Sequence, residues 1–431
     1  MKRLAALASA LLLCGCACDG AQPPAPTVLP TAAVAAQDDA DPLARAAGAY
    51  ELTGGEDSLG SGGCDSFFAD ENAVLVLGGA LSGTGATIDK TGDTADVEAA
   101  LRYGYNAAVA VHRGGSVTLS DALLTTNGAG ACGVFAAGEG TAAALHGGLL
   151  STAGGDSPGA AAVDGASVSL DDAEVLTDGT GSPCLYARDG GTLAAAGARC
   201  KATASAFLSL EGGGASLTNC AMSGGGAALS DGASLTVEGG SLTGEAGEAL
   251  FLTAGDAEAS LTGVTLETPQ GGALLCASGG AFTLRCSYQA LAGALSFGEG
   301  GSLLLVLQNN SSFTGSLPVE ARLPVTLTLD GTSRWFVTGD SRLMALTEGE
   351  DALSCIESNG FTVYYDAGRA ENAWLGGAEH PLPGGGVLKP LSGAPLRLPD
   401  RERALGAQAH ALAAGDALAA VDLGQRMVAL L

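Results

Sequence analysis

Short runs of alternating apolar and small polar residues recur along this chain, and each run ends in a turn residue. The turn residue returns every 20 to 26 residues, apart from one interval of 42. All but one of these residues are Gly, Asn or Asp, which tolerate left-handed or tight-turn backbone. A fixed period of this size predicts a solenoid. The turn residues are Gly54, Gly79, Asp121, Gly147, Asp172, Gly197, Asn219, Gly239, Gly263, Cys286, Asn309 and Gly331.

The positions two and four before each turn are apolar, and a Ser or Thr usually lies between them. This period-two alternation predicts a strand with one buried face and excludes a helix. An apolar position three residues after the turn predicts a second strand in each coil. We therefore predict an all-β, single-stranded parallel β-helix of roughly a dozen coils, in which Leu119, Leu145 and Leu170 stack in one file. The second apolar column comprises Leu124, Leu150, Val175, Cys200, Met222, Leu242 and Leu266.

Composition agrees with a solenoid and limits the partners. Aromatic residues make up only 4%, so small aliphatic side chains must fill the core, and 68 Gly argue against helical repeats. The formal net charge of −27 excludes nucleic acid as a partner, because phosphate backbones are bound by Lys and Arg.

The amino terminus has the pattern of a signal peptide. A basic start and a short apolar stretch precede Gly15-Cys16 within residues 1–18, which resembles a bacterial lipobox with Cys16 as the lipidated residue. Cys18 is the competing site, and an ordinary cleaved signal is the alternative. Residues 19–44 are rich in Pro and Ala and predict a disordered tether. We expect an extracytoplasmic, surface-displayed protein that meets the membrane through a lipid anchor only.

The interval of 42 residues predicts a loop inserted into one coil near residues 90–106. Loops that project from a rigid scaffold often carry function. Within this loop, Tyr103 and Tyr105 could stack on sugar rings, while Asp93 and Asp96 could bind through hydrogen bonds or a calcium ion. The alternative is a structural flap that covers one side of the coil stack. No other cofactor is expected.

The predicted β-helix spans residues 45–338, and the pattern changes beyond it. Residues 339–398 are expected to form a cap and a Pro/Gly-rich connection, and residues 399–431 an Ala/Leu-rich tail that could form weak helices. Eight Cys follow the signal region without metal-ligand spacing, so we predict no metal site and mostly buried, free thiols. No two acids occupy adjacent coils at the outward station before the turn, so no catalytic residue is assigned.

Several segments resemble bacterial surface lipoproteins of the right-handed parallel β-helix type, described as adhesin-like or pectin-lyase-like. The resemblance covers about residues 45–390 and implies surface attachment or glycan contact. The segments that carry it are 70–76 (DENAVLV), 181–183 (GSP), 216–220 (SLTNC), 335–341 (WFVTGDS), 360–366 (GFTVYYD) and 373–377 (AWLGG).

Three functions are consistent with these patterns. The first is a membrane-anchored, surface-displayed adhesion module whose Ser/Thr face or 90–106 loop contacts a polysaccharide or a host surface. The second is a polysaccharide lyase or glycoside hydrolase on the same fold. The third is a purely structural surface spacer. Fold alone does not decide between them, and the sequence favours a protein that is not an enzyme.

Overall fold

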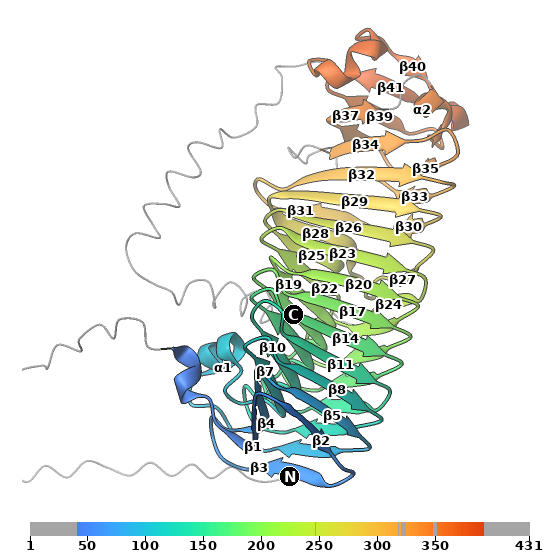
Figure 1. The fold of residues 1–431 in the computed structure, drawn as a ribbon. Helices are drawn as coiled ribbons and strands as arrows, with labels where there is room; N and C mark the ends of the chain where they lie inside the picture. Colours follow the sequence, from blue (N-terminus) through green and yellow to red (C-terminus); the bar gives the residue numbers. More distant parts are fainter. Residues whose placement is uncertain (1–40, 246, 318, 320–324, 348–350, 392–431) are drawn as a thin grey trace, which may run out of the picture. The chain divides into compact units, whose positions relative to one another are not determined.

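The computed structural model describes residues 41–391 except 246, 318, 320–324 and 348–350. It is nearly all β, with 53% strand and 7% helix, and its parallel sheets stack as a β-solenoid of about 14 turns (Figure 1). The predicted fold class is therefore confirmed. Cys16, the signal region, nearly all of the tether and the 399–431 tail lie outside the described residues. None of the helices in the described part has the length and apolar character needed to cross a membrane.

Most coils contribute one strand to each of three parallel sheets, which we call A, B and C. Sheet A contains β1 (Gly48–Thr53), β4 (Asn72–Leu77), β7 (Val109–His112), β10 (Val134–Ala137), β13 (Ala160–Val163), β16 (Leu185–Arg188), β19 (Leu208–Glu211), β22 (Ala227–Ser230), β25 (Ala249–Ala254), β28 (Ala273–Gly279) and β31 (Leu295–Phe297). Sheet B contains β2 (Glu56–Leu59), β5 (Ala80–Thr84), β8 (Ser116–Ser120), β11 (Ala142–His146), β14 (Ser167–Asp171), β17 (Thr192–Ala196), β20 (Gly214–Thr218), β23 (Ala233–Glu238), β26 (Ala257–Thr262), β29 (Ala281–Ser287), β32 (Ser302–Gln308), β34 (Val325–Leu329) and β37 (Ala345–Thr347). Sheet C contains β3 (Gly63–Ser66), β6 (Thr87–Lys90), β9 (Leu123–Thr126), β12 (Leu149–Thr152), β15 (Glu174–Thr177), β18 (Arg199–Ala202), β21 (Ala221–Gly224), β24 (Ser241–Gly244) and β27 (Thr265–Glu267).

The last coils replace sheets A and C with two smaller sheets, D and E. Sheet D contains β30 (Ala290–Ala292), β33 (Ser312–Gly315), β35 (Arg334–Val337) and β38 (Ile356–Glu357). Sheet E contains β36 (Ser341–Leu343), β39 (Thr362–Tyr365), β40 (His380–Pro381) and β41 (Val387–Pro390). Here β40 pairs antiparallel with β41 and interrupts the parallel stacking at this end. The helices are η1 (Pro42–Arg45), α1 (Val97–Tyr103), α2 (Asp351–Ser354), η2 (Ala370–Leu375) and η3 (Pro383–Gly385).

Identical positions stack in the core as the periodicity predicts. Leu119 pairs with Leu145 and Leu145 with Leu170, and none of the three is more than 4% exposed. The second predicted column forms the inner face of sheet C, from Leu124 on β9 to Leu266 on β27. Because each side chain lies over the same position of the next coil, mainly aliphatic residues, with a few aromatic ones, enclose a continuous apolar core.

The predicted turn column needs two corrections. Gly54 and Gly79 follow strands of sheet A, whereas the other turns follow strands of sheet B; the residue that belongs to the column is Gly85, with φ 65°. Cys286 lies on β29 with its side chain fully buried, and the turn is at Tyr288, with φ 51°. Alternation alone did not exclude Gly54 and Gly79, because the positions two and four before each of them are apolar in these sheet A strands as well.

The inserted segment contains α1 and lies outside sheet A (Figure 1). A second apolar cluster, separate from the core, covers the outer face of the first strands of this sheet, with Leu75, Phe135 and Tyr186 among its members. A Cβ at Gly104, directly after α1, would overlap the ring of Phe135. The insert therefore packs closely on sheet A, which explains why β7, β10 and β13 are buried along their whole length.

Candidate binding surface

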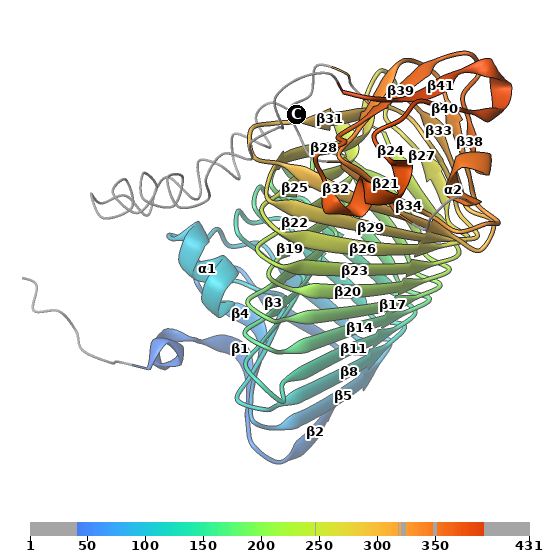
Figure 2. The same cartoon turned by 90° about the horizontal axis from the view of Figure 1, so that it is seen from above.

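The outer face of sheet B presents a row of small side chains on nine consecutive strands, from β2 to β26. We call it the hydroxyl row. Backbone pairing places each member beside the next, about 4.8 Å away, and all are exposed or half-buried. Figures 1 and 2 show these strands lying one above another along the stack. The row comprises Ser58, Ser82, Thr118, Ala144, Ser169, Ala194, Ser216, Thr236 and Ser260.

The row is flat because its neighbours along each strand point into the core. On β8, for example, Val117 and Leu119 are 2% and 1% exposed on either side of Thr118. Each Ser or Thr hydroxyl can donate one hydrogen bond and accept two. Such a face can form hydrogen bonds with a polyhydroxylated ligand and provides little apolar area for a protein partner.

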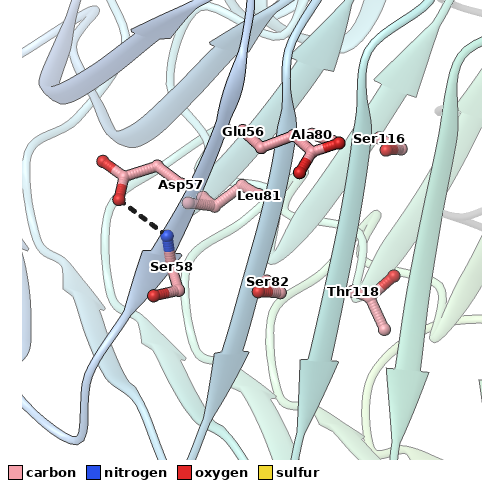
Figure 3. Close-up of a pocket in the computed structure, with 8 residues that line it drawn as sticks. All are labelled: Glu56, Asp57, Ser58, Ala80, Leu81, Ser82, Ser116 and Thr118. Atoms are coloured by element: carbon pink, nitrogen blue, oxygen red, sulfur yellow. Dashed lines mark hydrogen bonds between the residues drawn. The ribbon is translucent and has the colours of Figure 1, made fainter.

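The first three strands of sheet B form a hollow of about 510 Å³ at one end of this face (Figure 3). Ser58, Ser82 and Thr118 of the hydroxyl row line it together with the acidic residues Glu56 and Asp57. Acidic and hydroxyl groups are thus combined here, whereas the next six positions of the row carry only hydroxyl and methyl groups.

Asp57 alternates with Glu56 and Ser58 along β2, in register with the buried Leu81, and hydrogen bonds fix its carboxylate. It accepts hydrogen bonds from the hydroxyl of Tyr50 at 2.7 Å and from the N–H of Ser58 at 2.8 Å. The bond from Tyr50, followed by that from Ser58, lowers the pKa of Asp57, so this carboxylate stays ionised. Burial, and then Asp57 itself, raise the pKa of Tyr50 to about 12.

A histidine–aspartate pair lies beside the hydroxyl row. Nδ1 of His146 on β11 lies 3.1 Å from Oδ2 of Asp171 on β14, and Ser120 occupies the matching position on β8. The order follows that of a Ser–His–Asp relay. The two side chains are 48% and 54% exposed, so solvent screens the pair, and we assign it to the polar surface. The register of adjacent coils places Asp171 beside His146.

The two predicted acids of the insert make hydrogen bonds within the protein. Asp93 accepts from the N–H of Ala129 at 2.9 Å. Asp96 is the N-cap of α1 and accepts from the N–H of Ala99 at 3.1 Å. An N-cap carboxylate satisfies one of the free N–H groups at the start of a helix. Both acids therefore have a structural role, and calcium binding by them stays a prediction.

The two predicted tyrosines of the insert stack on each other, with ring centroids 5.5 Å apart. Tyr105 is only 4% exposed and donates its hydroxyl hydrogen to the carbonyl oxygen of Pro42 at 2.7 Å. The guanidinium of Arg45 lies over its ring, and that of Arg102 lies over the ring of Tyr103. The insert thus joins η1 to sheet A, as expected of the flap alternative, and sugar stacking by these rings stays a prediction.

The described residues contain no group of three or more His, Cys, Asp or Glu side chains arranged to hold a metal ion. Comparison of the sequence and structure with protein-family models, curated proteins and solved structures finds no match. The fold and the surfaces described above therefore carry the functional argument alone.

Proposed function

We propose that this protein is an extracytoplasmic, lipid-anchored binding module whose hydroxyl row contacts a polysaccharide. The observation that carries the proposal is the row itself, in which small side chains face solvent at paired positions on nine strands. Selection for solubility alone would favour charged side chains at such positions, as it does elsewhere on a protein with a net charge of −27. A repeating array of donors and acceptors suits a repeating ligand.

The resemblance to adhesin-like β-helix lipoproteins supports this proposal, as does the lipobox pattern at Cys16. With the tether of residues 19–44 behind the anchor, the solenoid would be displayed outside the membrane. Mass spectrometry of the mature amino terminus tests the anchor: a diacylglyceryl-modified Cys16 is expected, and an unmodified end would contradict it.

A glycan array and a cell-wall pull-down with the purified mature protein test the binding. We expect binding to a neutral or weakly charged polysaccharide, since the negative hollow and the net charge oppose acidic ligands. In the triple variant Thr118→Lys, Ser169→Lys and Ser216→Lys, long side chains cover the row. The apparent Kd should rise at least about tenfold, which corresponds to about 1.4 kcal/mol.

The matched control is Ser151→Lys, Ser223→Lys and Thr243→Lys on the outer face of sheet C, where the charge change is the same. Equal loss in both triple variants would show a charge effect and not a site. A folded protein that binds no glycan would favour the structural spacer, and new reducing ends or unsaturated products would favour the lyase or hydrolase.

A further inference from the structure

A lysine is fully buried at the base of the insert. Lys90 ends β6 and is 0% exposed, in register with Ser66 on β3 and Thr126 on β9. Its Nζ donates hydrogen bonds to the carbonyl oxygens of Phe68 at 2.8 Å and Gly92 at 2.9 Å. Both acceptors are neutral, so neither hydrogen bond compensates the ammonium charge with a carboxylate. Burial of a lysine in this way is costly and calls for an explanation.

A buried asparagine lies beside this amine. Asn106 is 1% exposed, and its Nδ2 donates to the same Gly92 oxygen at 2.8 Å and to the carbonyl oxygen of Ala129 at 3.3 Å. Among the described residues, Oδ1 of Asn106 has no hydrogen-bond partner. Buried side-chain oxygens without partners are rare. The amine of Lys90 and the carboxamide of Asn106 therefore both donate to the carbonyl oxygen of Gly92. The carboxamide oxygen accepts no hydrogen bond from the described residues.

The surroundings favour a nucleophilic amine. Burial lowers the pKa of Lys90, and the nearby carboxylates of Glu71, Asp70 and Asp93 act in the opposite direction. Glu71 is held by a hydrogen bond of 2.7 Å from the hydroxyl of Ser66, one coil before Lys90. A carboxylate in this place can take a proton from the ammonium and return it to a leaving nitrogen.

We propose that Lys90 and Asn106 form an intramolecular amide crosslink. Nζ of Lys90 attacks Cγ of Asn106, a new C–N bond forms, and the bond from Cγ to Nδ2 breaks. The lysine ammonium and the carboxamide become a secondary amide and an ammonium ion, so no oxidant or other co-reactant is needed. The shared hydrogen bonds to the carbonyl oxygen of Gly92, and that from Asn106 to Ala129, hold the two groups together, as proximity catalysis requires. The crosslink closes the segment that contains α1 and is independent of polysaccharide binding.

The mass of the intact, denatured protein tests this inference. We expect the wild-type chain to be lighter than its sequence by one ammonia, and the Lys90→Met variant to have its full sequence mass. Lys201→Met, at a lysine paired with Glu245 on the surface, is the control and should keep the ammonia loss.

Tryptic mapping locates the bond. Trypsin cleaves after Arg45, Arg102 and Arg113, so a crosslink at Lys90 gives peptide 46–102 joined to peptide 103–113. Separate peptides 46–90, 91–102 and 103–113 at full mass would overturn the proposal. Loss of water in place of ammonia would assign the bond to an acid, and ammonia loss that persists in Lys90→Met would assign it to a succinimide at an Asn-Gly pair; either result also overturns it.

Discussion

At the scale of single residues, the corner after sheet B shows why Gly alternates with Asp or Asn. From Gly85 to Asn309, each corner residue has positive φ, which Gly, Asp and Asn tolerate. At Asp121, Asp172 and Asn219, Oδ1 lies over the corner of the next coil, close to where a Cβ would lie there, whereas the Cβ position at Gly331, the corner after Asn309, is open. A Gly at the next corner avoids this contact. The pairs are Asp121 with Gly147, Asp172 with Gly197, and Asn219 with Gly239.

Two corner glycines allow a matched test of close packing. Gly240 has φ 72°, and a Cβ there would overlap the backbone of Cys220. Gly263 has φ 60°, and a Cβ built on it would have no atom within 4 Å. Gly263→Ala should lower the free energy of unfolding by about 1–2 kcal/mol, the cost of left-handed backbone. Gly240→Ala should cost about 1–3 kcal/mol more, because the backbone cannot move aside. Urea denaturation measures both, and equal losses would contradict the overlap.

At the scale of elements, the sequence predicted most strands of sheets B and C from β8 onward and missed those of sheet A there. Sheets B and C have one buried and one wet face, so their residues alternate, as in Ser-Val-Thr-Leu-Ser of β8. The insert and its neighbours bury both faces of sheet A near its start, so β10 reads Val-Phe-Ala-Ala without alternation. A short, wholly apolar run does not distinguish a strand from a helix segment.

The candidate site could be predicted only in part for the same reason. Alternation located the outward Ser and Thr positions, because each follows from its buried neighbours. The hollow beside Glu56 and Asp57 could not be found, because the first coils were placed out of register. The partners of Tyr105 and Asp96 come from η1 and from within α1, contacts on which the period of the coils gives no information.

The turn between β34 and β35 predicts a dependence of stability on pH. Burial alone would raise the pKa of Asp330, but hydrogen bonds from the backbone N–H of Asn309 and from Ser333 and Thr332 lower it to about 2. A carboxyl whose pKa falls on folding stabilises the protein above its unfolded pKa of about 3.9, and this stabilisation is lost as the pH falls towards 2. Asp330→Asn should be less stable than wild type at pH 7, with the difference shrinking between about pH 4 and pH 2. A constant difference in unfolding midpoint over that range would contradict the assignment.

The N-cap of α1 gives a second test at this scale. Asp96→Ala removes the acceptor for the N–H of Ala99 and should cost about 0.5–2 kcal/mol, felt locally by the insert. Asp96→Asn is the control, since Asn caps helices about as well as Asp. Hydrogen exchange of residues 97–103 should accelerate in the Ala variant and remain nearly unchanged in the Asn variant. If exchange accelerates equally in both variants, the charge of Asp96 and not its capping hydrogen bond stabilises the helix.

At the scale of the whole molecule, the first coil presents strand edges, which are liable to pair with other chains. In the described part of the chain, β1, β2 and β3 are each paired on one side only. Their exposed acids, among them Glu51, Glu56 and Asp65, place negative charge along these edges. Like charges on two such edges oppose end-to-end association.

Neutralising these acids should therefore promote self-association. The variant Glu51→Gln, Glu56→Gln and Asp65→Asn is expected to form concentration-dependent oligomers in sedimentation velocity at low salt. The control Glu174→Gln, Glu238→Gln and Glu258→Gln changes the net charge equally, away from these edges, and should remain like wild type. If both variants associate, the reduced net charge of the protein and not the loss of charge at the strand edges causes the association.

The alternation at the sheet B corner also governs how this solenoid can change in length. Excision of residues 147–171, a single turn, would bring Asp172 over Asp121, with its Cβ where the carboxylate of Asp121 lies. Excision of residues 147–196 would bring Gly197 there and restore the original fit. The variant that lacks residues 147–171 should thus have a lower melting temperature than the variant that lacks residues 147–196, although it loses less of the protein. In this stretch the chain should therefore tolerate the removal of two turns better than the removal of one, because Oδ1 of Asp121 leaves room for Gly at the next corner.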